Sequence, residues 1–327
     1  MKTSRDVAKI ANVSQATVSR VFSNPDLVSE KTKNKVLKAA KKLNYFPNLA
    51  ARSLKSNKSH IIGMIISSYN SIFYSAITRR IEKILKKYNY RLLTTFSSED
   101  PNTELECFNS LVTSRVDGII FTPVSLKTNH LLELSKRYNI SMLQLYRKAN
   151  NMMDSLTIND EEGTYLATKE LLINNHKRIL LIDYKTSVPT HRKNGYKRAF
   201  NEHNIKYSEN MIFYFNPDID NYLYLKEKIN ESKPTAIIAV TSNTGLHVLK
   251  YFKEENIHVP ENMSFVVYDD STWAQINDIS VITHPFDKIS KETATQILNL
   301  INNSTTLTTH NLINPFFINR KSIKTIN

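Results

Sequence analysis

The most concentrated chemistry in this sequence belongs to the cations of its first 60 residues. This segment holds 13 Lys and Arg against 3 Asp and Glu, whereas the remaining 267 residues hold 31 basic and 27 acidic side chains. A basic surplus confined to one small end is typical of a module that binds a polyanion such as nucleic acid. A solvated basic tail is the alternative reading of the charge alone.

Residues suited to catalysis or metal binding show no such concentration. The nine histidines have no metal-ligand spacing, and we find no nucleophile elbow, Ser-His-Asp pattern or phosphate-binding glycine loop. The single cysteine, Cys107, excludes an internal disulfide and is expected to be a packing residue in a reducing compartment. The sequence therefore predicts neither an enzyme nor a metal or cofactor site.

Three short helices are predicted to position the cations, over residues 4–11, 15–22 and 29–43. Asn12 suits the left-handed conformation of a tight turn, and Ser14 and Ser29 are good N-caps for the second and third helices. Pro47 ends the helical pattern, residues 48–55 are compatible with a short helix, and residues 56–59 form a polar linker.

From residue 61 the sequence pattern changes to apolar runs that alternate with amphipathic stretches. Regular alternation of this kind predicts parallel sheets with helices on both faces, and the length favours two lobes. The expected strands cover residues 61–67, 91–96, 118–122, 141–145, 178–183, 236–240, 265–268 and 281–283. The expected helices cover residues 73–88, 103–114, 130–138, 161–173, 192–203, 222–231, 245–255 and 288–302.

Residues 6–21 (DVAKIANVSQATVSRV) resemble the headpiece of the lactose-repressor/galactose-repressor family of bacterial transcription regulators. Further matches follow in the family's order along the whole chain, at residues 44–48 (NYFPN), 50–54 (AARSL), 116–120 (VDGII), 192–196 (RKNGY), 234–237 (PTAI), 259–264 (VPENMS), 268–270 (YDD) and 283–285 (THP). The headpiece motif is highly specific, and the body motifs gain weight from their collinear order.

The resemblance implies a small all-α helix-turn-helix headpiece and a two-lobed α/β body like a periplasmic sugar-binding protein. We expect the headpiece in residues 1–46 and a hinge in residues 47–59. The body follows in residues 60–327, with one lobe at about 60–157 and 285–310 and the other at about 158–283 and 311–327. Connections between the lobes are expected near residues 156–160, 283–286 and 309–314.

The resemblance also assigns DNA contacts. In the family the second helix enters the major groove, which implies that Gln15, Ala16 and Arg20 face the bases. Short polar side chains nearby suit phosphates, namely Ser14, Thr17, Ser19, Ser23 and Asn24. In the hinge the resemblance implies that Leu54 wedges into the minor groove, flanked by Asn48, Ala51 and Lys55.

An effector cleft between the lobes is implied in the same way. The residues at the family's positions are Phe73, Arg147, Arg192, Thr241, Ser242, Asp269, His284 and Phe286. A structural salt bridge is the alternative role for Arg192 and Asp269.

The sequence departs from the family at this cleft, because Thr241-Ser242 replaces a usual Asn-Asp and Tyr146-Arg147 replaces a usual Asp-Arg. The effector could be a sugar, a phosphosugar held by Arg147 and Arg192, a less polar molecule, or a protein corepressor, and the sequence does not choose among them.

The expected partners are a pseudo-palindromic double-stranded operator, a sugar-like effector and a second copy of the chain. The sequence shows no secretory signal and no apolar run of the ~18 residues that span a bilayer, so we expect a cytoplasmic protein without a membrane partner. No leucine-heptad extension is visible, which favours a dimer. Repression or activation, the operator and the regulated genes are not predicted.

Overall fold

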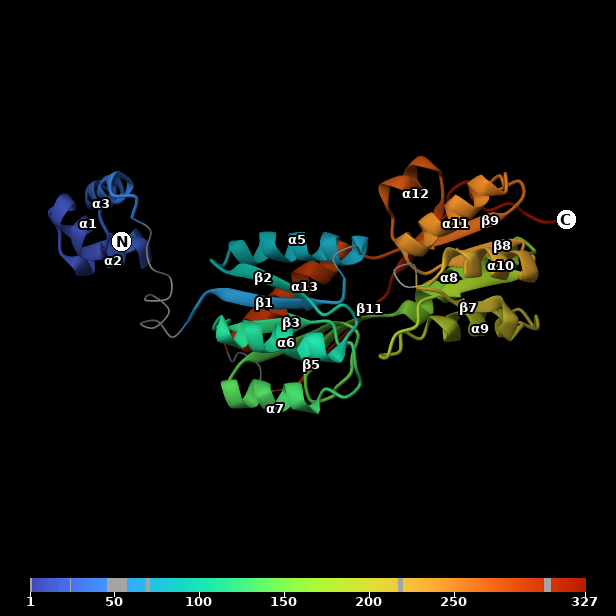
Figure 1. Ribbon diagram of the computed structural model, residues 1–327, viewed down its shortest axis with the longest axis horizontal. Helices are drawn as coiled ribbons and strands as arrows, with labels where there is room; N and C mark the ends of the chain where they lie inside the picture. Colours follow the sequence, from blue (N-terminus) through green and yellow to red (C-terminus); the bar gives the residue numbers. More distant parts are fainter. Residues whose placement is uncertain (1, 24, 46–57, 69–70, 217–219, 303–306) are drawn as a thin grey trace. The chain divides into compact units, whose positions relative to one another are not determined.

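The computed structural model describes residues 2–23, 25–45, 58–68, 71–216, 220–302 and 307–327, which form two compact units divided after residue 59. Figure 1 shows the helices and strands of each unit. Within the described residues, no helix is long and apolar enough to cross a membrane.

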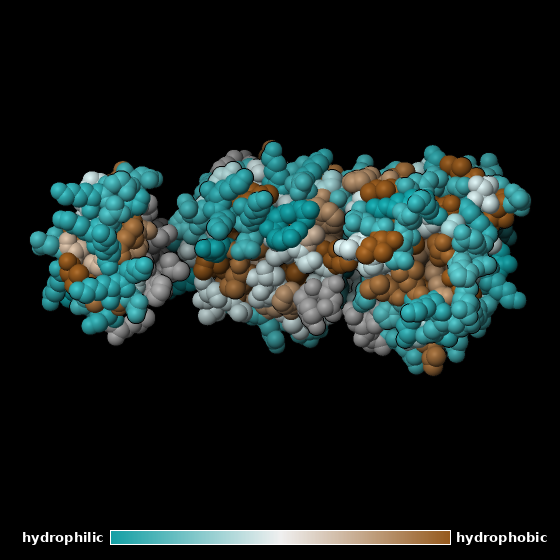
Figure 2. Space-filling view, turned by 90° about the horizontal axis from the view of Figure 1, so that it is seen from above, coloured by the Kyte–Doolittle hydropathy of each residue, from teal (hydrophilic) through white to brown (hydrophobic). Residues whose placement is uncertain are grey.

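The first unit is a three-helix module made of α1 (Ser4–Ala11), α2 (Gln15–Ser23) and α3 (Glu30–Lys42), with a 3₁₀ turn η1 (Pro25–Leu27) before α3. Thr3 and Asp6 cap α1 reciprocally, and Asn12 ends that helix in the left-handed conformation with φ 51°. The helices enclose a small core of buried Val and Ala side chains: Val7, Ala8, Ala11, Val18, Val21, Val36, Ala39 and Ala40. Hydrophilic residues cover much of the face of this unit that Figure 2 shows.

The second unit contains two six-stranded sheets. The first sheet has the order β11-β5-β4-β3-β1-β2, with all neighbours parallel. Its strands are β1 (Ile61–Ile66), β2 (Arg91–Phe96), β3 (Gly118–Phe121), β4 (Ser141–Tyr146), β5 (Asp154–Ile158) and β11 (His310–Ile313). Helices α5 (Ile72–Lys86) and α13 (Phe286–Ile301) cover one face, and α6 (Pro101–Thr113) and α7 (Asn129–Tyr138) cover the other (Figure 1).

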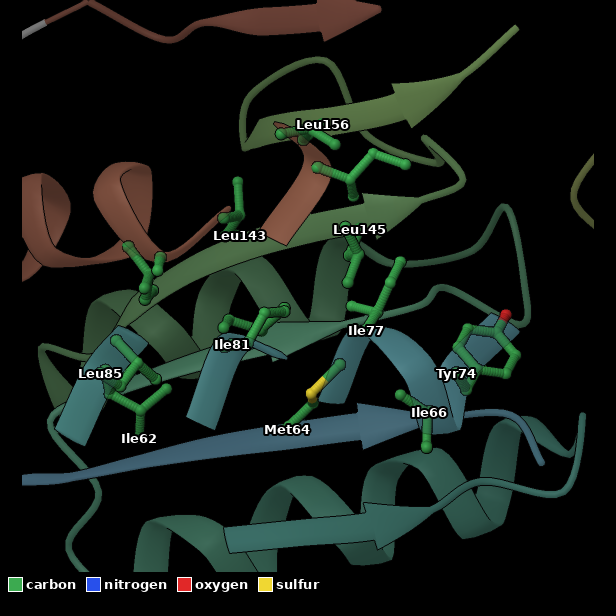
Figure 3. Packing of buried hydrophobic residues seen from close by; sticks show 14 of the residues in the cluster. Ile62, Met64, Ile66, Tyr74, Ile77, Ile81, Leu85, Leu143, Leu145 and Leu156 are labelled. Carbon is green, nitrogen blue, oxygen red and sulfur yellow. The ribbon is translucent and has the colours of Figure 1, made fainter. Parts of the chain in front are cut away.

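The core of this first lobe explains the apolar runs in the sequence. Ile62, Met64 and Ile66 alternate along β1 and face Ile77 and Ile81 of α5 (Figure 3). The intervening residue Ile65 packs on the opposite face with α6 and α7. A parallel sheet that is buried on both faces needs such continuous apolar strands.

The second sheet has the order β12-β10-β9-β8-β6-β7. Its strands are β6 (Ile179–Asp183), β7 (Ile212–Tyr214), β8 (Ala236–Ala239), β9 (Ser264–Tyr268), β10 (Ser280–Thr283) and β12 (Phe316–Ile318), and only β12 runs antiparallel to its neighbour. Helices α8 (Asp160–Ile173) and α9 (Arg192–Glu202) pack on one face, and α10 (Tyr222–Ser232), α11 (Ser242–Glu254) and α12 (Thr272–Ile276) pack on the other.

The chain passes between the two sheets three times, from β5 into α8, from β10 into α13, and from β11 to β12. The middle passage lies at the expected residues 283–286. The first and third expected connections, at residues 156–160 and 309–314, are largely occupied by β5 and β11, which add two strands to the first sheet. The first lobe therefore keeps the chain through Ile313, three residues beyond the expected boundary at 310.

The two-lobed α/β fold with a helical headpiece is confirmed, and so are the eight expected strands and eight expected helices of the body, with ends shifted by a few residues. The four strands β5, β7, β11 and β12 and the short helix α12 were not predicted from the sequence. Two of the missed strands, β7 and β12, have only three residues each, and in β5 and β11 polar residues interrupt the apolar run that marks the predicted strands.

Candidate functional site

Helix α2 presents one polar face to solvent. Val18 and Val21 are buried in the three-helix core, whereas Gln15, Ala16 and Arg20 are exposed. Ser19 is also exposed and Thr17 is half-buried. No hydrogen bond or ion pair ties the Arg20 guanidinium to another described residue, so this cation is available to an external acceptor.

Two of the expected DNA contacts take part in local hydrogen bonds. The Ser14 hydroxyl accepts from the backbone N–H of Thr17 at 3.0 Å and therefore caps α2. The Gln15 amide donates to the Ser4 hydroxyl at 2.9 Å and accepts from Arg5 at 3.4 Å. These contacts join the start of α2 to α1, and a base contact by Gln15 requires the amide to exchange them.

The remaining expected DNA contacts cannot be placed. Asn24 and the hinge residues Asn48, Ala51, Leu54 and Lys55 lie outside the described residues. Ser23 is the last residue of α2.

A pocket of about 360 Å³ lies between the two lobes of the body. It opens where strands of both sheets end at their carboxyl edges: Tyr146 ends β4, Val240 follows β8, and Asp269 follows β9. Ligands bind at this edge in open α/β sheets. Seven of the eight expected effector residues line the pocket, namely Phe73, Arg147, Arg192, Thr241, Ser242, Asp269 and His284.

The eighth expected residue, Phe286, does not line the pocket. Its ring packs behind Phe73 and His284, with 5.9 Å between ring centroids in each pair, and beneath the Arg80 guanidinium. Phe286 therefore supports the pocket wall and does not form its surface.

Arg192 is the most buried cation of the pocket and joins the two lobes. Its guanidinium pairs with Asp160 at 3.0 Å and Asp183 at 3.6 Å, and it donates to the Tyr146 hydroxyl at 2.5 Å. That hydroxyl in turn donates to Asp160 at 3.0 Å. Since Tyr146 comes from the first lobe and Arg192 from the second, this cluster connects them by hydrogen bonds.

The local packing of two helices holds Arg192 in place. Arg192 begins α9, and the Gly195 one turn later lies against the backbone of α8. A Cβ at position 195 would approach the Glu161 carbonyl oxygen to 1.9 Å. Glycine is required for this approach, which brings the start of α9 next to Asp160 at the start of α8.

Arg147 is held within the first lobe. Two guanidinium nitrogens donate to the two carboxylate oxygens of Glu99 at 2.8 and 2.9 Å, which is a bidentate pair. The Arg147 side chain is 6% exposed and that of Glu99 is 22% exposed.

Asp269 and His284 lie together in the lining of the pocket, with 3.7 Å between a carboxylate oxygen and Nε2. Burial raises the pKa of Asp269 to about 7, although nearby Arg192 opposes the shift. Burial and then the charge of Arg192 lower the pKa of His284 to about 3, so the imidazole is neutral at physiological pH.

Several pocket residues were missed by the sequence analysis. Tyr146, Tyr74, Glu99, Tyr184 and Leu246 line the pocket, and Asp160 and Asp183 stand behind Arg192. Asp183 ends an apolar strand, as Asp269 follows one, and that pattern could have identified it. Nothing in the sequence indicates that Glu99 pairs with Arg147. Among the described residues, no group of three or more His, Cys, Asp or Glu could hold a metal ion.

Comparison with known proteins agrees with both units. Residues 3–48 match the family model for bacterial regulatory proteins of the lacI family, and residues 59–321 match the model for periplasmic binding proteins and the sugar binding domain of the LacI family. Catabolite control protein A of Priestia megaterium is 32% identical over 86% of this chain and 87% of its own. The HTH-type transcriptional repressor PurR of Vibrio atlanticus is 30% identical over the full length of both chains.

A solved structure of a lac repressor has a similar fold. The Lac repressor dimer bound to operator and the anti-inducer ONPF superposes with a TM-score of 0.84, at 23% identity over 99% of both chains. The family models and the full-length relatives together show that this chain belongs to the lacI family of bacterial regulatory proteins, as a DNA-binding transcription regulator and not an enzyme.

Proposed function

We propose that this regulator is a repressor that binds a pseudo-palindromic operator as a homodimer. A small sugar-like molecule that binds in the pocket lowers or raises its affinity for the operator. The observation that carries the proposal is the exposed polar face of α2, where Arg20 has no partner among the described residues. Relatives named as a transcriptional repressor and as a catabolite control protein support repression.

On the operator, the hydrogen-bonding groups or the methyl group of each side chain determine which base it contacts. Arg20 pairs with guanine through two hydrogen bonds, Gln15 pairs with adenine, and the Ala16 methyl contacts thymine. Thr17 and Ser19 contact phosphates, and so do Ser14, Ser23 and Asn24. Asn48, Ala51, Leu54 and Lys55 remain hinge contacts proposed from the sequence, with Leu54 as the minor-groove wedge.

In the body, the residues that line the pocket bind the effector. Phe73 offers an apolar face, and Arg192, Asp269, Thr241 and Ser242 offer hydrogen bonds. Because the pocket lies between the lobes, a bound molecule favours one relative orientation of the lobes and so changes operator affinity. A protein corepressor is the alternative source of control.

The test begins with duplexes selected from a random library by the full-length protein, followed by mobility-shift titration of the selected site. Arg20→Ala should weaken binding to this site by about 10-fold or more, because one bidentate contact to guanine contributes ~1–3 kcal/mol of discrimination. Arg137→Ala removes the same charge from an exposed position on α7 and should bind like the parent. Equal loss in the two variants, or none in either, would reject α2 as the base reader.

A further inference from the structure

We infer that the pocket between the lobes takes an uncharged, hydroxyl-bearing ligand with an apolar face and excludes phosphorylated or carboxylated molecules. The inference rests on the proposed function, because it names the ligand class of the same pocket. It decides between the sugar and the phosphosugar that the sequence left open.

Both guanidiniums of the pocket already have anionic partners. Arg147 holds Glu99 through two hydrogen bonds, and Arg192 holds Asp160 and Asp183. A phosphate would have to displace these carboxylates, or add its charge beside them in a buried site. Displacement would leave the buried Asp160 and Asp183 without their partner, and an added phosphate would be repelled by their negative charge.

The balance of charge around the pocket also disfavours an anionic ligand. The pocket and the groups directly behind it hold four carboxyl groups, Glu99, Asp160, Asp183 and Asp269, against two guanidiniums. No lysine belongs to the described lining, and the nearby His284 is neutral. Even with Asp269 protonated, acidic groups outnumber the cations, so an anionic ligand is repelled.

Several buried polar atoms of the pocket residues lack a hydrogen-bond partner within the described part of the chain. Asp269 Oδ1, Arg192 Nε and His284 Nδ1 are buried and have no hydrogen-bond partner among the described residues. Asp269 as a carboxylate needs a donor, whereas Arg192 needs an acceptor. A hydroxyl group supplies both, and an ammonium group supplies only a donor and would meet the charge of Arg192. Adjacent hydroxyls of a neutral ligand therefore fit this part of the pocket best.

Part of the pocket lining is aromatic and apolar. The Phe73 and Tyr146 rings lie 4.6 Å apart between centroids, and Ile72, Tyr74 and Leu246 also line the pocket. Aromatic side chains of this kind pack against the apolar face of a ring. The volume of about 360 Å³ lies within the range of small-molecule sites.

The single tryptophan makes direct binding measurable. Trp273 donates from Nε1 to the Ser242 hydroxyl at 2.9 Å, and Ser242 lines the pocket. We would titrate the full-length protein with neutral hexoses, pentoses, disaccharides and aryl glycosides, with the phosphate esters of the same sugars, and with inorganic phosphate. Tryptophan fluorescence would detect binding, and calorimetry would give each dissociation constant.

At least one uncharged sugar or glycoside should bind saturably, and its phosphate ester should bind at least about 10-fold more weakly. A phosphate ester that binds as tightly as its neutral parent overturns the inference. It is also overturned if no uncharged compound of the panel binds.

A charge variant tests whether the pairing of Arg147 with Glu99 excludes anionic ligands. Glu99→Gln removes the carboxylate that holds Arg147 and should raise affinity for the phosphate esters by about 10-fold or more relative to the parent. Glu106→Gln makes the same change at an exposed position of α6 and should leave the preference unchanged. If Glu99→Gln gains no anion binding, the pairing of Arg147 is not what excludes anions.

Operator titrations separate this inference from the proposed function. A protein that binds its selected duplex but no uncharged ligand retains its DNA-binding role and loses the inferred ligand class. A protein that binds a neutral sugar without any change in operator affinity keeps the ligand class and loses the proposed control.

Discussion

At the scale of single residues, Tyr146 shows what the sequence could and could not predict about the pocket. Its position at the end of a strand was visible, and so was its replacement of a usual acidic residue. Its role depends on a contact between lobes, since its hydroxyl connects Arg192 to Asp160. Contacts between residues far apart in the chain have no local signature. The resemblance to the family therefore indicated seven pocket residues, while the pairing of their charges became known only from the structure.

Tyr146→Phe should destabilise the body by about 1–3 kcal/mol, because it removes a hydroxyl that is hydrogen-bonded to a buried ion pair. The ring contacts with Phe73 and Tyr74 are retained. The measurement is the thermal midpoint of the full-length protein followed by calorimetry. Tyr138→Phe removes the same atom from a 47% exposed side chain on α7 and should leave the midpoint unchanged. Equal midpoints for the two variants would contradict a structural role for the Tyr146 hydroxyl.

At the scale of elements, the long amphipathic helices and central apolar strands were predictable because each repeats its pattern over many residues. The edge strands β7, β11 and β12 and the short β5 were not, since pairing with a neighbouring strand creates them rather than their own periodicity. The close packing of α8 on α9 was not predicted from the sequence either, although Gly195 lies within a motif shared with the family.

Gly195→Ala should lower the thermal midpoint of the body and weaken ligand binding. The new methyl group meets backbone atoms of α8, so the helices must separate, at a typical cost of about 1–3 kcal/mol for overpacking. Gly118→Ala is the control, because its methyl group meets the ends of the Ile297 and Ile301 side chains at 3.0–3.1 Å, which can shift. A variant at 195 that is as stable as the one at 118 would show that the approach of α8 and α9 is not constrained.

At the scale of the whole molecule, control of transcription requires free-energy coupling between ligand and operator. If an uncharged ligand alters operator affinity by some factor, the operator must alter ligand affinity by the same factor, typically about 5–150-fold. Calorimetric titration of the ligand into free and operator-bound protein measures this directly. Arg20→Ala in the presence of the same duplex should give the ligand affinity of the free protein. Identical affinities for the free and operator-bound parent would mean that the ligand does not control the operator.

The three passages between the sheets also set the order in which a growing chain can complete its parts. The three helices of the first unit are all present once residue 45 has been synthesised, and β1 follows soon after. The first lobe, however, lacks α13 and β11 until residue 313, after most of the second lobe has been made. Translation that stops before residue 286 therefore leaves the three helices of the first unit intact and the first lobe without α13, one of the two helices that cover one face of its sheet. Such a fragment retains the element that reads DNA and lacks a complete sensor, so it cannot respond to the molecule that controls the full chain.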